Sequence, residues 1–306
     1  MNILFSTNSA FIIPTSVMLY SACVCHPDTP IDFYLAYHNL TAKDIDRLNT
    51  IVTSFPEKRM ILLDVGDEFE KTVKAKEQYS HESYYRILAV NLLPDSVHRI
   101  LYLDGDMLIR KNLQELYDTV LDATCPFVVC EDIHLDIRDY QYIKDGIHMP
   151  RTSRYFNAGM LLMNIDYLRQ MRSTGYIIDA FVREAGIYTC PDQDILNILY
   201  ADKVKFVPWT LYNLPPMHWN LDVNELLLGR IKYASYPELF NQPKEYINVT
   251  EQLKKHAYII HYMGNLLKPW KYRNGVFYED LALYSDLWFD CEKEMYQQIP
   301  TLEHLI

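Results

Sequence analysis

The chain has 306 residues, 49% of them hydrophobic, and a formal net charge of -11. This length is sufficient for one large α/β domain with a sizeable core or for two smaller domains. The negative charge argues against nucleic acid as a partner, since phosphates are met by basic surfaces, and no apolar run reaches the roughly 18 residues of a membrane span.

The first part of the chain alternates apolar runs with helical patterns. Strands are predicted at residues 3–5, 31–37 and 60–65, and helices begin near Pro14 and, with a cap and an acidic first turn, at Thr41. This order of strand, helix, strand, helix and strand predicts a parallel sheet with crossover helices. The sequence has no G-x-G-x-x-G, which argues against a dinucleotide or P-loop site.

The same patterns assign most of the remaining chain. We expect helices at residues 84–90, 112–117, 165–185, 191–197 and 279–298, and strands at residues 100–103, 127–130, 155–164, 204–207 and 257–264. Residues 66–80 are charged and aperiodic and are expected to form a surface loop or a short helix. Residues 132–150 are polar and irregular and are expected to form a loop with a helical piece, while residues 220–251 allow no assignment. No repeat or low-complexity linker divides the chain, so we expect one continuous domain with a C-terminal extension.

Two carboxylates, Asp104 and Asp106, follow the predicted strand at residues 100–103. The carboxyl ends of strands in an open α/β sheet are where ligands bind. Two like charges this close are costly unless a cation neutralises them, and oxygen ligands suit Mg²⁺ or Mn²⁺, which keep coordination sites for phosphates. The sequence therefore predicts a divalent metal that holds a phosphorylated donor. The alternative is a solvated acidic turn, because the D-x-D pattern is common.

A second acidic cluster opens the predicted helix at residues 191–197. Asp192 and Asp194 have an ordinary alternative role as helix caps. Gln193, between them, has no capping role and is the stronger functional candidate. Arg86, on the helix at residues 84–90, is either a solvated charge or a residue that reaches a donor phosphate or hydroxyl.

His261 ends a late predicted strand, as the acidic pair does. A lone buried histidine is commonly a hydrogen-bonded core residue, which is the alternative here. Two carboxylates and one imidazole form a mixed oxygen and nitrogen set that suits Mn²⁺. Lys268 follows closely and would supply the positive charge that a diphosphate needs in an acidic protein.

The cysteines and the N-terminal residues indicate the cellular compartment in which we expect the protein. None of the six cysteines forms a C-x-x-C pair, and Cys23 and Cys25 fall in a helical apolar pattern, where buried free thiols are expected. Reduced thiols fit a cytoplasmic enzyme, and residues 1–8 lack the basic region of a signal peptide. We therefore expect a soluble, cytoplasmic protein.

Several short motifs occur in the order of a known family. They are FSTN (residues 5–8), YR (85–86), LYLDGD (101–106), FNAG (156–159), DQDILN (192–197), HYMG (261–264) and KPW (268–270). Together they span most of the chain, and the sequence resembles glycosyltransferase family 8. This retaining group includes bacterial lipopolysaccharide α-galactosyl- and α-glucosyltransferases and, more distantly, glycogenin.

The resemblance implies a GT-A fold, with a Rossmann-like mixed, mostly parallel sheet flanked by helices. It implies a nucleotide-sugar-binding catalytic domain at residues 1–270 and a helical C-terminal extension at residues 271–306. The implied donor is a UDP-hexose carrying galactose or glucose, and the implied acceptor is a glycan or glycoprotein, as in polysaccharide biosynthesis. The tail is acidic, so it is not expected to bind membranes as the basic tails of some relatives do.

The resemblance also assigns individual residues. The implied Mn²⁺ ligands, with Mg²⁺ as an alternative ion, are Asp104, Asp106 and His261. The implied donor-binding residues are Asn8, Arg86, Asp104, Asn157, Ala158, Gly264 and Lys268. Gln193 and Asp192 are the implied catalytic residues.

The implied mechanism is front-face displacement, with Gln193 as the side chain nearest the anomeric carbon. The reaction passes through an oxocarbenium-like ion pair, and the leaving phosphate oxygen accepts the proton of the acceptor. An amide dipole stabilises positive charge there but is a poor nucleophile. The sequence departs from the family pattern at two places. Asn8 stands where relatives often carry an aspartate that recognises uracil, and three residues rather than two separate Gly264 from Lys268.

Two other classes of function compete with this interpretation. A metal-dependent nucleotidyltransferase or sugar-nucleotide hydrolase would share the acidic turn, although the sequence has no glycine-rich loop for a triphosphate. A non-enzymatic carbohydrate-binding protein would use the 25 tyrosines of the chain and would not need the three metal ligands.

Overall fold

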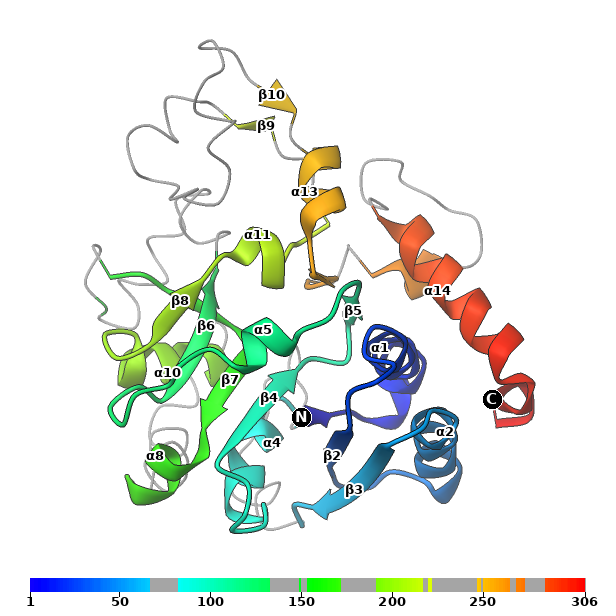
Figure 1. The fold of residues 1–306 in the computed structure, drawn as a ribbon, viewed down its shortest axis with the longest axis horizontal. Helices are drawn as coiled ribbons and strands as arrows, with labels where there is room; N and C mark the ends of the chain where they lie inside the picture. Colours follow the sequence, from blue (N-terminus) through cyan, green and yellow to red (C-terminus); the bar gives the residue numbers. More distant parts are fainter. Residues whose placement is uncertain are drawn as a thin grey trace.

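A seven-stranded sheet forms the centre of the protein in the computed structural model (Figure 1), which describes residues 1–66, 82–132, 149, 153–171, 191–216, 220–221, 247–248, 250–264, 268–272 and 284–305. Its strands are β1 (Asn2–Ser6), β2 (Ile31–Tyr37), β3 (Lys58–Asp64), β4 (Arg99–Leu103), β6 (Phe127–Glu131), β7 (Phe156–Asn164) and β8 (Lys205–Val207). The strand order is β3-β2-β1-β4-β7-β6-β8. Strand β7 is antiparallel to both of its neighbours, while the other neighbouring strands pair in parallel. The predicted mixed, mostly parallel sheet is confirmed.

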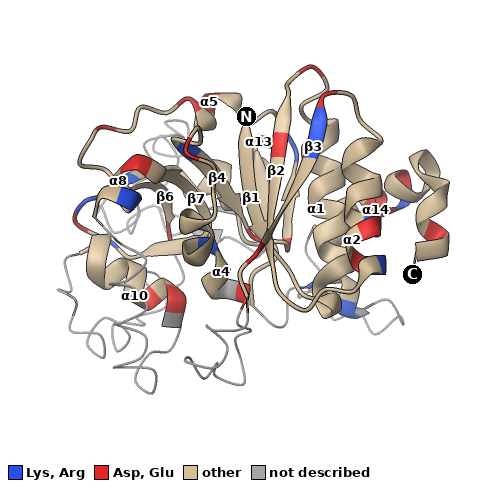
Figure 2. Cartoon of the chain, turned by 90° about the horizontal axis from the view of Figure 1, so that it is seen from below, with Lys and Arg blue, Asp and Glu red and all other residues tan. Residues whose placement is uncertain are grey.

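Helices cover both faces of this sheet. They are α1 (Ile12–Val24), α2 (Ala42–Thr53), α4 (Glu82–Leu88), α5 (Gln114–Tyr117), α8 (Ile165–Gln170), α10 (Pro191–Tyr200), α11 (Trp209–Tyr212), α13 (Thr250–His256) and α14 (Ser285–Gln298). Short 3-10 helices occupy Ser9–Phe11 (η1), Ala89–Asn91 (η2), Pro269–Tyr272 (η4) and Pro300–Leu305 (η5). In Figure 2, α1, α2 and α14 lie together on one side of strands β1 to β3.

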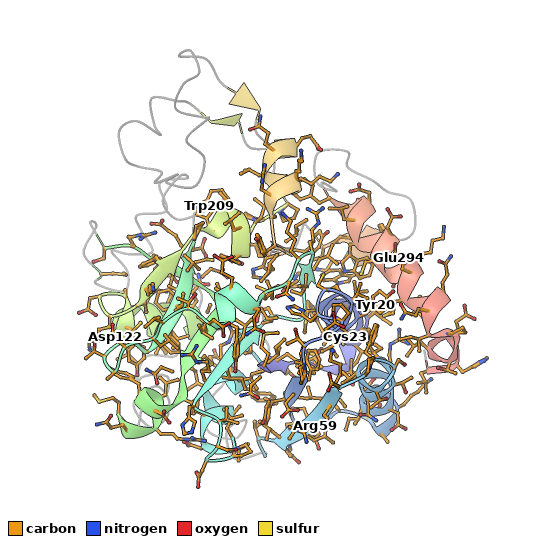
Figure 3. The ribbon with its side chains drawn as sticks, in the orientation of Figure 1. Tyr20, Cys23, Arg59, Asp122, Trp209 and Glu294 are labelled. Carbon is orange, nitrogen blue, oxygen red and sulfur yellow. The ribbon has the colours of Figure 1, made fainter. Side chains whose placement is uncertain are left out.

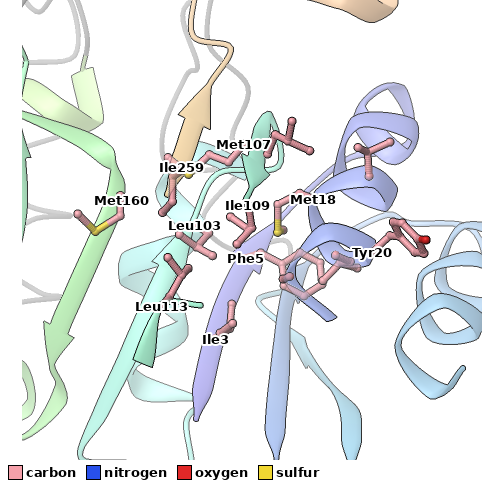
Figure 4. Close-up of a cluster of buried hydrophobic side chains, with 14 of the residues drawn as sticks. Ile3, Phe5, Met18, Tyr20, Leu103, Met107, Ile109, Leu113, Met160 and Ile259 are labelled. Atoms are coloured by element: carbon pink, nitrogen blue, oxygen red, sulfur yellow. The ribbon is translucent and has the colours of Figure 1, made fainter. Parts of the chain in front are cut away.

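Successive residues of the strands enter two different hydrophobic clusters. In β4, Leu101 and Leu103 belong to the cluster that contains α1, α2 and α14, whereas Ile100 and Tyr102 belong to the cluster that contains α4, α8 and α10. This alternation is the period of two expected of a strand. Figure 4 shows part of the first cluster, where Leu103 lies near Met18 of α1. Because both faces are buried, the strands are nearly continuous apolar runs, and this made them recognisable in the sequence.

A separate two-stranded ribbon joins two distant parts of the chain. Strand β5 (Met107–Ile109) pairs in antiparallel fashion with β11 (Ile259–His261), and His261 lies opposite Met107. The acidic turn at residues 104–106 immediately precedes β5. The ribbon therefore carries His261 to the carboxyl end of β4. A second ribbon, β9 (Asn220–Leu221) with β10 (Ile247–Asn248), lies within the range left unassigned from the sequence.

The C-terminal helix shares the core of the sheet. Trp288 and Met295 of α14 are buried in the cluster that also contains α1, and Tyr20 of α1, labelled in Figure 3, donates a hydrogen bond of 2.9 Å to Gln298. The division of the chain at residue 270 stays a prediction. Among the described residues, no helix combines the length and the apolar character needed to cross a bilayer.

Several predicted boundaries differ from the structure. Helix α8 ends at Gln170 with Met171 as its C-cap, so the prediction of one unbroken helix over residues 165–185 is wrong. The strand predicted at residues 257–264 is shorter in the structure, where β11 spans Ile259–His261. One hydrogen bond on each side continues its pairing with β5, from Arg110 to the carbonyl of Tyr258 and from Tyr262 to the carbonyl of Asp106. Residues 67–81, 133–148, 172–190 and 279–283, which carry parts of the predicted loops and helices, lie outside the described residues.

Candidate active site

The acidic turn is held between the sheet and α1. The backbone N–H of Asp104 donates to the carbonyl of Gly159 on β7, at 2.9 Å. A Cβ at Gly105 would lie 2.4 Å from the hydroxyl oxygen of Thr15 on α1, so the turn approaches the helix this closely because residue 105 is glycine. Asp106 is buried and Asp104 is partly exposed. The alternative of a solvated acidic turn is therefore excluded for Asp106.

His261 meets the two carboxylates from the β11 side. Its Nε2 lies 3.1 Å from an oxygen of Asp106 and 3.7 Å from an oxygen of Asp104. Its Nδ1 lies 2.8 Å from the side-chain oxygen of Asn213, and both of these residues are buried. Asn213 was not identified from the sequence, where it is a single polar residue after a short helix.

These three side chains fit a divalent cation. One ligand atom each of Asp104, Asp106 and His261 lies within 4.8 Å of the others. A Cβ at Gly159 would lie 2.4 Å from the His261 ring and 2.7 Å from an oxygen of Asp104, so the glycine keeps the space between the ligands open. Carboxylate oxygen and imidazole nitrogen are donors that Mn²⁺ accepts together.

Lys268 provides a cation beside this group of ligands. Its ammonium nitrogen lies 2.5 Å from an oxygen of Asp106. The same nitrogen lies over the rings of Phe11 and Trp270, at 4.9 and 5.3 Å from their centroids. Burial alone would raise the pKa of Asp106, but Lys268, whose charge acts most strongly, and the neighbouring His261 outweigh burial and hold that pKa well below the usual value. Asp106 is therefore kept as a carboxylate despite its burial.

Arg86 of α4 joins the acidic turn to α10. Its guanidinium lies 3.2 Å from Asp104 and 3.2 Å from Asp192, and it donates to the carbonyl of Ala158. Its carbon Cζ is 4.4 Å from the centroid of the Tyr102 ring, a cation–π distance. Burial opposes its charge, but Asp104, Tyr102 and Asp192 together raise its pKa. The alternative in which Arg86 is a solvated surface charge is wrong.

Asp192 is the second carboxylate, beside Asp104, that pairs with Arg86. It lies in the first turn of α10 and is buried. Burial raises its pKa, and nearby Asp104 raises it further, while Arg86 acts in the opposite direction. Among the described residues, Arg86 is the cation that pairs with Asp192, and a buried carboxylate whose charge depends on such a pair is typical of functional sites.

Gln193 is held in a fixed orientation by three neighbours. Its side-chain oxygen accepts from the backbone N–H of Ala158, at 2.9 Å, and from the amide of Asn157, at 3.1 Å. Its side-chain nitrogen donates to Asp132, at 2.9 Å. Asp132 directly follows β6, as Asp104 directly follows β4, and this repetition of a strand end followed by an acid was the missed signal in the sequence.

Asp194, the remaining acid of the cluster at residues 191–197, anchors α10 to the residue before β7. Asp194 is fully buried and accepts from the hydroxyl of Tyr155, at 2.5 Å. Asn197, one turn beyond Gln193, bonds both the N–H and the carbonyl of Phe156, each at 2.8 Å. These contacts fix α10 against β7 and thereby fix Gln193.

Two predicted donor-binding residues lie at the edge of this network. The side-chain oxygen of Asn8 accepts from the N–H of Phe11 and caps η1, while its nitrogen lies 3.3 Å from a carboxylate oxygen of Glu82. Gly264 has a φ of +77° and is exposed, so its backbone conformation favours glycine. The other predicted site residues are linked by direct contacts: Arg86, Asp104, Asp106, Asn157, Ala158, Asp192, Gln193, His261 and Lys268.

Comparisons with known proteins find one matching family model and several similar glycosyltransferases. The family model described as Glycosyl transferase family 8 matches residues 2–274. Lipopolysaccharide 1,3-galactosyltransferase of Salmonella typhimurium is 23% identical over 211 residues, which cover 67% of this chain and 61% of that protein. Lipopolysaccharide 1,2-glucosyltransferase of Escherichia coli K12 is 21% identical over 296 residues, which cover 95% of this chain and 79% of the relative.

A solved structure shares the fold along almost the whole chain. The galactosyltransferase LgtC, crystallised in complex with donor and acceptor sugar analogues, superposes with a TM-score of 0.72 and 21% sequence identity, over 96% of each chain. The predicted GT-A architecture is confirmed by this likeness.

Proposed function

Because the chain belongs to glycosyl transferase family 8, a family of retaining glycosyltransferases, we propose that it transfers galactose or glucose from a UDP-sugar to a glycan acceptor. The single observation that carries this proposal is the convergence of Asp104, Asp106 and His261 around the space left by Gly159. The names of the two lipopolysaccharide hexosyltransferases support the choice of hexose and of a glycan acceptor. The expected cytoplasmic location stays a prediction.

We propose that Asp104, Asp106 and His261 hold a divalent cation. The mixture of two carboxylates with one imidazole favours Mn²⁺, and Mg²⁺ is the alternative ion. When bound, such an ion supplies Lewis-acid stabilisation of the negative charge on a departing diphosphate.

Positively charged side chains of the protein would neutralise the rest of the negative charge of the donor diphosphate. Lys268, beside Asp106, would bind the diphosphate through its ammonium group, and Gly264 would contact the diphosphate through its backbone. Arg86 is buried among Asp104, Asp192 and Ala158 and would orient the groups that contact the transferred hexose. The other proposed donor contacts are Asn157 and Ala158 around the sugar and Asn8 at the base.

We assign the catalytic roles to Gln193 and Asp192. The amide of Gln193 is fixed by Ala158, Asn157 and Asp132, so its dipole is already oriented and does not need to reorganise when positive charge develops on the anomeric carbon. Asp192 would accept a hydrogen bond from a sugar hydroxyl while Arg86 preserves its charge. In the proposed front-face displacement, the bond from the anomeric carbon to the phosphate oxygen breaks, and that oxygen takes the proton of the attacking acceptor hydroxyl.

Release of UDP measures this proposal directly. We expect Mn²⁺-dependent release of UDP from UDP-galactose or UDP-glucose, accelerated by a glycan acceptor and accompanied by a glycosylated product. Release at the same rate without an acceptor, with free hexose as the product, would instead favour the sugar-nucleotide hydrolase. Release that is unaffected by chelating the metal would overturn the proposed role of Asp104, Asp106 and His261.

A further inference from the structure

Asn213 is a buried side chain that touches the proposed metal site through one of its ligands. It follows α11 and has 1% of its surface exposed, while His261 has 3%. The oxygen of its amide lies 2.8 Å from Nδ1 of His261. The opposite nitrogen of the same ring, Nε2, is the one that faces Asp106 and Asp104.

The backbone holds Asn213 and His261 in a fixed relation. The next residue, Leu214, forms a parallel bridge with Ile260 in the centre of β11. Its N–H donates to the carbonyl of Ile259, at 3.1 Å, and its carbonyl accepts from the N–H of His261, at 2.9 Å. On its other side, Asn213 donates its own N–H to the carbonyl of Trp209, at 2.9 Å. The segment therefore acts as a short additional strand that delivers Asn213 to the ring of His261.

A neutral imidazole carries one proton, and its two nitrogens differ in what they can do. A side-chain amide oxygen only accepts hydrogen bonds, so the contact with Asn213 requires the proton on Nδ1. Nε2 is then left with its lone pair directed at the carboxylates. If the proton lay on Nε2 instead, that nitrogen would donate to Asp106, which is 3.1 Å away, and would not be available to a cation.

We propose that Asn213 is a positioning residue that sets the tautomer and the ring orientation of His261, so that Nε2 serves as the third ligand of the cation. This inference rests on the proposed function, because it needs the cation site of Asp104, Asp106 and His261. Hydrogen-bond partners of metal-bound histidines commonly change metal affinity 10- to 100-fold when they are removed. We expect an effect of about that size here.

The first test is the affinity for Mn²⁺, measured by titration in the presence of saturating UDP. Asn213→Leu preserves the size of the side chain but removes the acceptor, and we expect it to weaken Mn²⁺ binding by about 10- to 100-fold. Asn213→Asp restores an acceptor and should bind Mn²⁺ at least as tightly as the wild type. The matched control is Asn164→Leu, which removes the contacts of Asn164 with Tyr167 and Cys125 at the far end of β7 and should leave Mn²⁺ affinity unchanged.

The second test is the tautomer itself, read from the nitrogen NMR signals of His261 without metal and well above the ordinary pKa of histidine. We expect the proton on Nδ1 in the wild type and a shift toward Nε2 in Asn213→Leu. A wild-type proton on Nε2, or equal Mn²⁺ affinity in Asn213→Leu and the wild type, would overturn the role of Asn213 and leave the proposed function standing. Failure of the wild type to bind Mn²⁺ would overturn the proposed function instead, while the tautomer measurement would still test the contact.

Discussion

Two regions of the molecule each bury one arginine and one histidine, and their partners differ. The first region is the packing around α1, where Arg47 joins α2 to α1 and the C-terminal segment and His26 joins the end of α1 to Leu113. Arg86 and His261 lie in the second region, at the carboxyl end of β4. All four side chains are at most 4% exposed. Burial therefore does not distinguish a structural residue from a site residue in this chain.

In the first region the partners are neutral. Arg47 donates to the hydroxyl of Ser16, the carbonyl of Leu302 and the hydroxyl of Tyr296, at 3.0, 3.1 and 2.7 Å. His26 bonds the carbonyl of Ala22 and the N–H of Leu113, each at 2.7 Å. Because these groups belong mostly to the backbone, they tie chain segments together and leave the histidine no nitrogen for a ligand.

In the second region the partners are carboxylates. Arg86 contacts Asp104 and Asp192, and His261 contacts Asp104 and Asp106. Carboxylates gathered this closely repel one another, and in the described part of the chain the two cations beside them, Arg86 and Lys268, are fewer than the three acids that they contact. A bound cation would relieve this repulsion. The chemical class of the partners, rather than burial, is what identifies the second region as a site.

The largest expected effect is the loss of transfer in Asp104→Asn. The amide keeps an oxygen for the hydroxyl of Tyr102, and Arg86 keeps Asp192, so the free energy of unfolding should change by less than about 1 kcal/mol. The loss of one carboxylate ligand should lower kcat/KM by about 1000-fold, or about 4 kcal/mol. Transfer assays and urea unfolding measure the two effects.

The control for this variant is Asp32→Asn, which changes a carboxylate on β2 outside both regions. Asp32 pairs with Arg59 at the surface, at 2.6 Å, and its replacement should leave transfer unchanged. If Asp104→Asn instead retained metal-dependent transfer near the wild-type rate, the carboxylates of the second region would be structural and the contrast between the regions would disappear.

The next effect is on stability, in Arg47→Met. The replacement removes three hydrogen bonds that fasten the C-terminal segment to α1 and α2, and it leaves the carbonyl of Leu302 without this donor. We expect a loss of about 3 kcal/mol in the free energy of unfolding, with the KM for the donor unchanged. Urea unfolding followed by transfer kinetics on the folded variant checks both parts.

The comparison with Arg47→Lys separates charge from geometry. Lysine keeps the charge but lacks the planar fork that reaches three acceptors, so it should restore only part of the stability. A donor KM that rose several-fold in either variant would contradict the assignment of Arg47 to a purely structural region.

The sequence predicted more of the fold than of the site. The strands β2 and β4 were recognisable because sheets buried on both faces give continuous apolar runs. The acidic turn was recognisable because two carboxylates followed such a run. That His261 joins them was suggested by its position at the end of a predicted strand, and the family resemblance then assigned it as a ligand. Nothing local in the sequence pairs β11 with β5.

Asp132 and Asn213 were missed for the same physical reason. Each is a single polar residue outside regular structure, and its partner is far away in the chain: 61 residues separate Asp132 from Gln193, and 48 separate Asn213 from His261. The role of His26 likewise depends on a distant group, the backbone N–H of Leu113. Contacts of this kind arise from strand pairing and helix packing, which periodicity does not encode.

A smaller effect on catalysis is expected for Gln193→Ala. Removing an oriented amide dipole should lower kcat by about 10- to 100-fold, while the KM for the UDP-sugar changes by less than about threefold. Steady-state kinetics with both UDP-galactose and UDP-glucose separates the two parameters. The variant also frees Asp132 and Asn157 from their shared contact, so its unfolding should be measured in parallel. A loss of UDP affinity with kcat preserved would show that Gln193 binds the donor rather than acting on the reacting carbon.

The smallest expected effect is a pH dependence of stability that originates in the first region. Burial lowers the pKa of His26 below the ordinary value of about 6.5, although its bond to Ala22 acts in the opposite direction. The unfolded chain therefore takes up a proton at His26 before the folded protein does. The stabilisation is complete above the unfolded pKa and is lost as the pH falls from there through the folded pKa, by at most about 1.4 kcal/mol per pH unit.

This contribution is isolated by comparing the wild type with His26→Asn across that pH range. Other groups titrate in both proteins, so their effects cancel in the difference between the two free energies of unfolding. We expect the difference to shrink as the pH falls, because only the wild type carries the imidazole that must be kept neutral to accept from Leu113. If the difference between the two free energies of unfolding stayed constant with pH, His26 would keep its contacts when charged. The first region would then tolerate two buried cations, Arg47 and His26, instead of one.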